Sequence, residues 1–246
     1  MPELALGGLA DGTVEIGWLV LDEGAGDLAG LLSPDERERA GRFRAPAARA
    51  TFMQSRAALR RRLGHCLGLA PGEVPISLSA NGQPELTAGA GLPDLRFNLA
   101  HTHGLMLCAF ALGRRVGIDV ELRAPDLPWL DMAGTAFSAA EQAALAALPA
   151  DARRMGFYAG WTRKEAWLKG LGTGFSARAL QVTDVPVDPR TLAALPLRDP
   201  SGAVWNLCDL TIADWASDCA AALACEGEPP PLRWLDLSAW PNRSGA

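Results

Sequence analysis

A single carboxylate stands between two lysines in the stretch WTRKEAWLKGLGTG, which runs from Trp161 to Gly174. Residues 157–169 suit a helix, and a helix places Glu165 and Lys169, four residues apart, on one face. Two interpretations are open for this pair. It could be an ordinary surface ion pair, which contributes little to stability, or its charges could bind a ligand.

A second pair of carboxylates lies in Val116–Glu121, VGIDVE, which is typical of a short β-strand. Asp119 and Glu121 point to the same side of such a strand, with Cα atoms roughly 6–7 Å apart. They would repel each other unless they are solvated, protonated or bridged by a cation. Oxygen ligands without Cys or His suit Mg²⁺, with Mn²⁺ as the alternative metal. The other interpretation is a polar outward face of the strand.

Two histidines follow an asparagine in FNLAHTH, residues 97–103. His101 and His103 could bind a phosphate or a metal, or they could be structural. No third neutral ligand stands nearby, which argues against a zinc site. The region before them is rich in arginine, and a minority of these side chains could contact a phosphate bidentately. The arginines are Arg37, Arg39, Arg42, Arg44, Arg49, Arg56, Arg60, Arg61 and Arg62.

The elements that must position these side chains are helices and short strands. Ser33-Pro34 predicts a helix start, and helix then continues to about Gly68 with an interruption near Pro46. Further helices are predicted over 138–148 and 157–169, a turn over 81–84, and an irregular tail from Pro229. Strands are predicted over 13–21, 74–79, 95–99, 105–112, 116–121, 180–185, 204–212 and 218–225. Helix before strands in both parts predicts two similar α+β halves, joined between residues 112 and 128.

Composition limits the class of protein. The chain has 246 residues, 49% of them hydrophobic and 21% charged, which suits one large domain or two small ones. The net charge of −5 argues against a broad nucleic-acid surface. The sequence has neither a signal-peptide pattern nor an uncharged apolar run of about 18 residues, so no membrane association is expected. Five cysteines without a CxxC pair indicate reduced thiols and a cytoplasmic protein.

Taken together, VGIDVE and the later WTRKEAWLKG resemble the two signature motifs of the Sfp-type 4′-phosphopantetheinyl transferases. The resemblance extends to FNLAH, to Gly82-Gln83-Pro84 and to the Ser33-Pro34 helix start. It implies a pseudo-dimer of two α+β halves, here 1–115 and 116–246, with the site between them. It also implies transfer of the phosphopantetheine arm of coenzyme A to a serine of an apo acyl, polyketide or peptidyl carrier protein. We expect a monomer, because a pseudo-dimer already supplies a site between halves.

The resemblance also implies roles for individual residues. Asp119, Glu121 and Glu165 correspond to the Mg²⁺ ligands, and Glu165 and Lys169 to the catalytic residues. The residues expected to bind coenzyme A are Arg39, Gly82, Gln83, Pro84, His101, Thr102, Asp119, Lys164 and Lys169. Among these, Arg39 and His101 correspond to contacts of the 3′-phosphate, Lys169 to a pyrophosphate contact, and Gly82–Pro84 to the loop beside adenine.

The sequence departs from the family pattern at three positions, one of which is Glu36, where some members have a basic residue. Gln83 stands where a lysine is common, and Ala100 stands where a serine is common. An alternative hypothesis is therefore a coenzyme A or nucleotide-binding module that has lost catalysis. A further alternative is another Mg²⁺-dependent phosphoryl or nucleotidyl enzyme. The group that takes the serine proton, a carboxylate or a metal-bound water, stays open.

Overall fold

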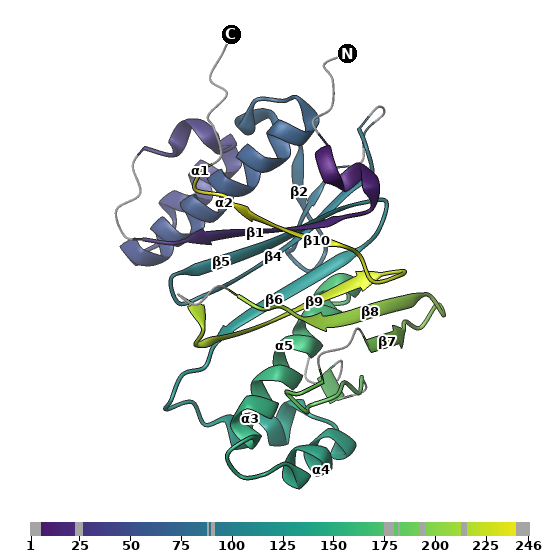
Figure 1. The fold of residues 1–246 in the computed structure, drawn as a ribbon. Helices are drawn as coiled ribbons and strands as arrows, with labels where there is room; N and C mark the ends of the chain where they lie inside the picture. The colour runs from purple at the N-terminus through teal and green to yellow at the C-terminus, as the bar shows by residue number, and fades with distance from the viewer. Residues whose placement is uncertain are drawn as a thin grey trace.

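Two four-stranded sheets form the centre of the protein in a computed structural model (Figure 1). The structure describes residues 6–22, 27–87, 89, 92–174, 180–181, 183–191, 195–212 and 216–239. Helices cover the outer sides of both sheets, which gives an α+β fold, as the sequence predicts. The pseudo-dimeric relation of the halves and the boundary at 115/116 stay predictions.

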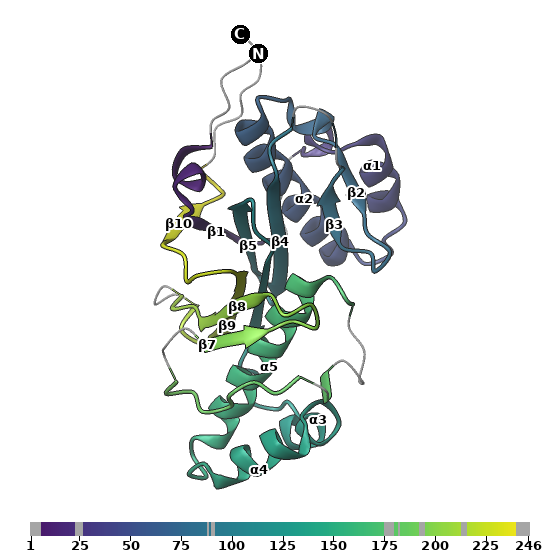
Figure 2. The ribbon, with the colours of Figure 1, turned by 90° about the vertical axis from the view of Figure 1, so that its right-hand side faces the viewer.

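The first sheet has the strand order β10-β1-β5-β4. Its strands are β1 (Val14–Val20), β4 (Leu95–Thr102), β5 (Leu105–Leu112) and β10 (Leu232–Asp236). β10 runs parallel to β1, and the other neighbours are antiparallel. Helices α1 (Pro34–Gly41) and α2 (Pro46–Leu67) lie on one side of this sheet (Figure 2). Leu59 of α2 packs there in one buried cluster with Phe97 of β4 and Phe110 of β5.

The second sheet is antiparallel, with the order β6-β9-β8-β7. Its strands are β6 (Val116–Leu122), β7 (Leu195–Arg198), β8 (Val204–Asp209) and β9 (Cys219–Glu226). Helix α5 (Arg153–Leu171) packs across it, and α3 (Trp129–Ala136) and α4 (Ala139–Ala147) pack beyond α5. A short hairpin of β2 (Ile76–Leu78) and β3 (Pro84–Leu86) and three 3₁₀ helices complete the described elements. The 3₁₀ helices are η1 (Gly7–Asp11), η2 (Ala29–Leu31) and η3 (Pro71–Glu73).

Local sequence signals account for several element boundaries. Ser33 and Ser138 each form a capping box with the glutamate three residues later, so both predicted helix starts are confirmed. The 157–169 helix is confirmed too, although it starts earlier, at Arg153. It ends before Gly172, which has φ +69° and therefore a left-handed conformation that glycine adopts without strain.

Glycine also sets how closely α5 approaches β6. A Cβ atom on Gly117 would lie 2.0 Å from the carbonyl oxygen of Ala166 and 2.3 Å from the amide nitrogen of Gly170. Any side chain at 117 would therefore push the helix away from the strand. This contact matters for function because β6 carries Asp119 and Glu121, and α5 carries Glu165.

Two predictions about the second half of the chain are wrong. The tail from Pro229 is not irregular, because residues 232–236 form β10 and bond to β1; residues 240–246 lie outside the described part. The strand expected over 180–185 is absent from the described residues there: 180–181 are helical and 183–185 have no regular structure. Residue 182 lies outside the described part. β3, β7 and α3 had no counterpart among the predicted elements.

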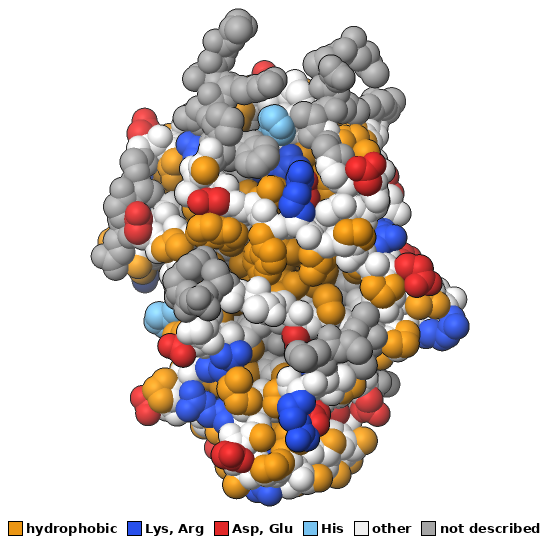
Figure 3. All heavy atoms as spheres, in the orientation of Figure 1, with side chains coloured by type: hydrophobic (Ala, Val, Ile, Leu, Met, Phe, Trp, Pro, Cys, Tyr) orange, Lys and Arg blue, Asp and Glu red, His pale blue; other side chains and the backbone are white. Residues whose placement is uncertain are grey.

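The surface shows no broad basic field on the face seen in Figure 3, where basic and acidic side chains are interspersed around a central apolar band. Leu232 and Trp234 of β10 are among the exposed large apolar residues. None of the helices in the described ranges has both the length and the apolar character needed to cross a membrane.

Candidate active site

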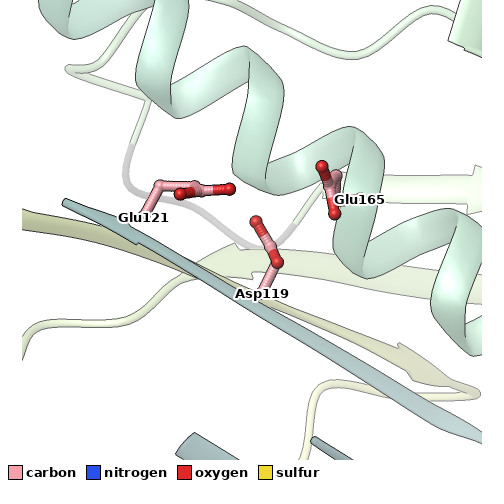
Figure 4. A group of neighbouring side chains, drawn as sticks. All are labelled: Asp119, Glu121 and Glu165. Carbon is pink, nitrogen blue, oxygen red and sulfur yellow. The ribbon is translucent and has the colours of Figure 1, made fainter. Parts of the chain in front are cut away.

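Three carboxylates from two elements meet where α5 crosses β6 (Figure 4). Asp119 and Glu121 project from β6 and Glu165 projects from α5, with one oxygen of each within 4.8 Å of the others. Asp119 is almost fully buried, and the other two are partly buried. Trp161 Nε1 donates a hydrogen bond of 3.3 Å to Glu121 Oε1, which fixes that carboxylate beside the helix.

Burial and mutual repulsion make these groups harder to ionise than free carboxylates. Desolvation raises the pKa of Asp119, and desolvation together with the charge of Asp119 raises the pKa of Glu121. Desolvation, followed by the charge of Asp119, raises the pKa of Glu165 to about 7, although Lys169 opposes the shift. The cluster therefore favours a bound proton or a bound cation.

Lys169 supplies one such cation from within the chain. Its Nζ atom lies 2.6 Å from Asp119 Oδ1 and 3.5 Å from Glu165 Oε2. Burial alone would lower the pKa of Lys169, but the charges of Asp119 and Glu165 outweigh burial and raise it. The ammonium group thus partly neutralises the carboxylates, and the surface-pair interpretation of Glu165 and Lys169 does not describe their surroundings.

The donor set fits a hard divalent cation. All the candidate ligands are carboxylate oxygens, the chemistry that Mg²⁺ prefers. The Oδ2 atom of Asp119 is buried and has no hydrogen-bond partner among the described residues. A buried carboxylate oxygen without a partner is costly, and a cation at the cluster would satisfy it.

The β2–β3 turn closes over the end of α5 beside this cluster. Asn81 Nδ2 donates a hydrogen bond of 2.7 Å to the carbonyl oxygen of Gly172. Gly82 has φ +76°, so the tight turn that presents Gln83 suits glycine. Gln83 and Lys169 line two neighbouring pockets of about 410 Å³ and 270 Å³. Glu165 lines the smaller pocket and Pro84 lines the larger one, so the structure brings the predicted turn and the α5 residues together.

His101 lies at the end of β4, on the exposed surface. It is near enough to Asp119 for its charge to lower the pKa of that carboxyl, against the larger effect of burial. His103 is exposed in the turn after β4. Thr102 is placed differently: its hydroxyl accepts a hydrogen bond of 3.1 Å from the backbone N–H of Leu122.

A pair of arginines on α1 and α2 shares one aromatic ring. The guanidinium carbons of Arg39 and Arg56 lie 5.3 Å and 5.6 Å from the ring centroid of Phe52. Arg56 is buried, its Nη1 has no partner among the described residues, and its pKa is lowered, mainly by desolvation. Arg56 Nε lies 3.8 Å from Glu36 Oε1, so its charge is partly balanced within the chain, while its Nη1 can still donate to an anion. Arg56 could not be singled out from the sequence, because nothing there distinguishes it from the neighbouring arginines.

Lys164 does not belong to this site. Its Nζ atom is fully buried on another side of α5, 2.6 Å from Glu141 Oε2, and donates hydrogen bonds to the carbonyl oxygens of Leu180 and Thr183. The prediction that Lys164 contacts coenzyme A is not supported by this arrangement. Adjacent sequence positions on a helix point about 100° apart, which is why Lys164 and Glu165 serve different surroundings.

Known proteins resemble this chain in sequence. A model of the 4′-phosphopantetheinyl transferase superfamily matches residues 115–224, which include β6 and α5. The 4′-phosphopantetheinyl transferase HetI of Nostoc sp. is 35% identical over 202 residues, 82% of this chain and 81% of the relative. The 4′-phosphopantetheinyl transferase Sfp of Bacillus subtilis is 29% identical over 146 residues, 59% of this chain and 62% of the relative. By sequence, this chain belongs to the 4′-phosphopantetheinyl transferase superfamily.

Proposed function

We propose that the protein transfers the 4′-phosphopantetheine arm of coenzyme A to a serine hydroxyl of an apo carrier protein. The serine oxygen forms a bond to the β-phosphorus, the pyrophosphate bond breaks, and adenosine 3′,5′-bisphosphate leaves. Membership of the superfamily and the buried cluster of Asp119, Glu121 and Glu165 beside Lys169 support this reaction. The cluster is the observation that carries the proposal, because three adjacent carboxylates, one buried and two partly buried, carry more negative charge than the single ammonium of Lys169 balances.

Asp119, Glu121 and Glu165 would hold Mg²⁺, and Mn²⁺ would fit the same oxygens. When bound, the metal supplies positive charge that stabilises the pyrophosphate as negative charge builds on the leaving group. Lys169 serves the same end as a point charge, because its ammonium is already held at the cluster by Asp119. Glu165 keeps its catalytic assignment as a holder of the metal; its pKa of about 7 applies to the metal-free cluster, because a bound cation lowers the pKa of a carboxyl, so it does not select the acceptor of the serine proton.

The nucleotide would be held by the first half of the chain. Arg39, Arg56 and His101 are the donors we assign to the 3′-phosphate, and the unused Nη1 of Arg56 supports this assignment. Gln83 and Pro84 line the larger pocket, which would take the adenine end. Gln83 can donate hydrogen bonds but carries no charge, so the phosphates depend on the arginines and Lys169 for charge neutralisation.

The decisive experiment measures transfer directly. The protein is incubated with coenzyme A, Mg²⁺ and apo acyl or peptidyl carrier proteins, and the intact mass of each carrier is recorded. We expect the mass of the carrier to increase by one phosphopantetheine group. When EDTA chelates the metal, we expect no increase. Full transfer in EDTA would contradict the metal assignment.

A pair of variants isolates the cluster in the same assay. Glu165→Gln is expected to lower the transfer rate by orders of magnitude, because several kcal/mol of charge stabilisation is at stake. Asp188→Asn is the matched control, since Asp188 is a carboxylate in an exposed ion pair with Arg190. Coenzyme A binding without transfer by the wild-type protein would support the catalytically inactive binding module instead. The carrier class, a monomeric state and a cytoplasmic location stay predictions.

A further inference from the structure

The two sheets meet at β4 and β6, and side chains make the connection. Asn98 Oδ1 accepts a hydrogen bond of 3.1 Å from the backbone N–H of Ile118, and Thr102 Oγ1 accepts one of 3.1 Å from that of Leu122. β4 and β6 belong to different sheets and are not paired through their backbones. These two side-chain hydrogen bonds link the strands instead. We call this contact the β4–β6 junction.

The spacing of the two bonds fixes the register of the strands. The acceptors are four residues apart on β4, and the donors are four residues apart on β6, so the strands run parallel. A slip of one residue would break both bonds at once and leave backbone N–H groups without partners. Asn98 and Ile118 are buried, which makes an unpaired N–H there costly. Apolar packing of Ala100 with the buried side chains of β6 continues the contact between the bonds.

The bonds of the junction lie on either side of the functional residues on both strands. On β4, His101 stands between Asn98 and Thr102. On β6, Asp119 and Glu121 stand between Ile118 and Leu122. His101 belongs to the sheet that also packs against the arginine-bearing α2, whereas the carboxylates belong to the sheet that packs against α5. The junction therefore joins the nucleotide side of the site to its metal side.

We propose that Asn98 and Thr102 are positioning residues that set the distance and register between the 3′-phosphate site and the carboxylate cluster. They act through the backbone of β6 and do not touch coenzyme A. The inference rests on the proposed function, because it concerns how a single coenzyme A molecule spans both sides. When the junction is weakened, the 3′-phosphate site should keep its affinity for nucleotide and the carboxylate cluster its affinity for Mg²⁺. The transfer rate should fall, because the reaction needs both sites correctly placed at the same time.

Thr102 offers a matched pair of variants. Thr102→Val keeps the shape of the side chain but removes the acceptor, and Thr102→Ser keeps the acceptor. Three quantities are measured for each: the Kd of Mg²⁺ alone, the Kd of adenosine 3′,5′-bisphosphate without metal, and kcat and KM for transfer from coenzyme A. For Thr102→Val we expect both Kd values within about twofold of wild type and kcat lowered by roughly ten- to a hundred-fold, because misplacement of about 1 Å has this effect. Thr102→Ser should restore most of the rate.

Other outcomes would overturn the inference. If the Kd for adenosine 3′,5′-bisphosphate is higher in Thr102→Val than in Thr102→Ser and wild type, the hydroxyl binds the nucleotide directly. Equal kcat in the Val and Ser variants would show that the junction does not position the site. If Thr102→Val does not fold by circular dichroism, Thr102→Ala is compared with Thr102→Ser under the same criteria. A wild-type protein that binds coenzyme A but transfers nothing overturns the proposed function, and this inference with it.

Discussion

Glu165 shows how the surroundings of one side chain change its chemistry. In a surface pair it would be ionised at any physiological pH. Here burial and Asp119 raise its pKa to about 7, while Lys169 limits the shift. Because the pKa in the folded protein lies above the usual value near 4.5, the metal-free protein loses stability from this group as pH rises through about 7.

The same shift predicts that Mg²⁺ affinity depends on pH. Metal binding requires the ionised carboxylate, so a proton on Glu165 competes with the metal below about pH 7. We expect the Kd for Mg²⁺ to rise by up to about tenfold per pH unit between pH 7 and pH 5.5, and to change little above pH 8. Calorimetric titration in buffers of different ionisation enthalpy measures both the affinity and the proton released. A constant Kd from pH 8 to pH 6 would contradict the shift.

Arg56 supports a prediction about the 3′-phosphate. Its unused, buried Nη1 can donate a charge-assisted hydrogen bond, which is worth about 1.5–3 kcal/mol. Coenzyme A should therefore bind roughly ten- to a hundred-fold more tightly than dephospho-coenzyme A, and Arg56→Gln should remove most of that preference. Arg190→Gln is the control, because Arg190 pairs with Asp188 in an exposed position and lines neither pocket. Equal Kd values of the wild type for both ligands would contradict the assignment.

At the scale of elements, α5 has two working sides. One side presents Glu165 and Lys169 to the carboxylate cluster. The other buries Arg163 and Lys164, which hold the chain that follows the helix. Arg163 donates hydrogen bonds to the carbonyl oxygens of Pro186, Asp188 and Thr191 and pairs with Asp209 at 2.6 Å. Lys164 donates hydrogen bonds to the carbonyl oxygens of Leu180 and Thr183, and Glu141 Oε1 accepts one from the backbone N–H of Val185.

This arrangement predicts a stability role for Lys164 in place of a ligand role. Lys164→Met leaves Glu141 buried without its counter-ion, which should lower the free energy of unfolding by about 3–5 kcal/mol. The double variant Lys164→Met/Glu141→Gln should recover part of that loss. Urea denaturation measures stability, and Kd for coenzyme A is measured well below the melting temperature. Unchanged stability with weakened coenzyme A binding would restore the original ligand prediction.

Elements with a local sequence code could be predicted, and elements that depend on distant partners could not. A capping serine marked the start of each of α1 and α4, and Pro34 supported the start of α1. β10 was missed because it follows a proline-rich stretch and gains its partner from β1, at the other end of the chain. The expected strand over 180–185 failed because its apolar residues pack on α4 and α5 and its backbone bonds to buried side chains instead of a neighbouring strand.

At the scale of the molecule, the site could be predicted where residue types were diagnostic. The carboxylates of β6 and α5, and Lys169 one turn after Glu165, could be predicted as a metal and phosphate site from their residue types and spacing alone. Arg56 and the separation of Lys164 from Glu165 required the packing, because burial and missing partners are properties of the folded chain. The junction residues Asn98 and Thr102 likewise become visible only when β4 lies beside β6.

The pairing of β10 with β1 also has a consequence for the order in which the protein can mature. Glu15 on β1 is fully buried and pairs with Arg62 of α2 and with Arg233 of β10, a residue 218 positions later. During synthesis, the first sheet lacks its edge strand and Glu15 lacks one counter-ion until β10 has left the ribosome. Contacts of such sequence separation form slowly. The nucleotide side of the site, although encoded first, therefore completes its packing only after the metal side has been made.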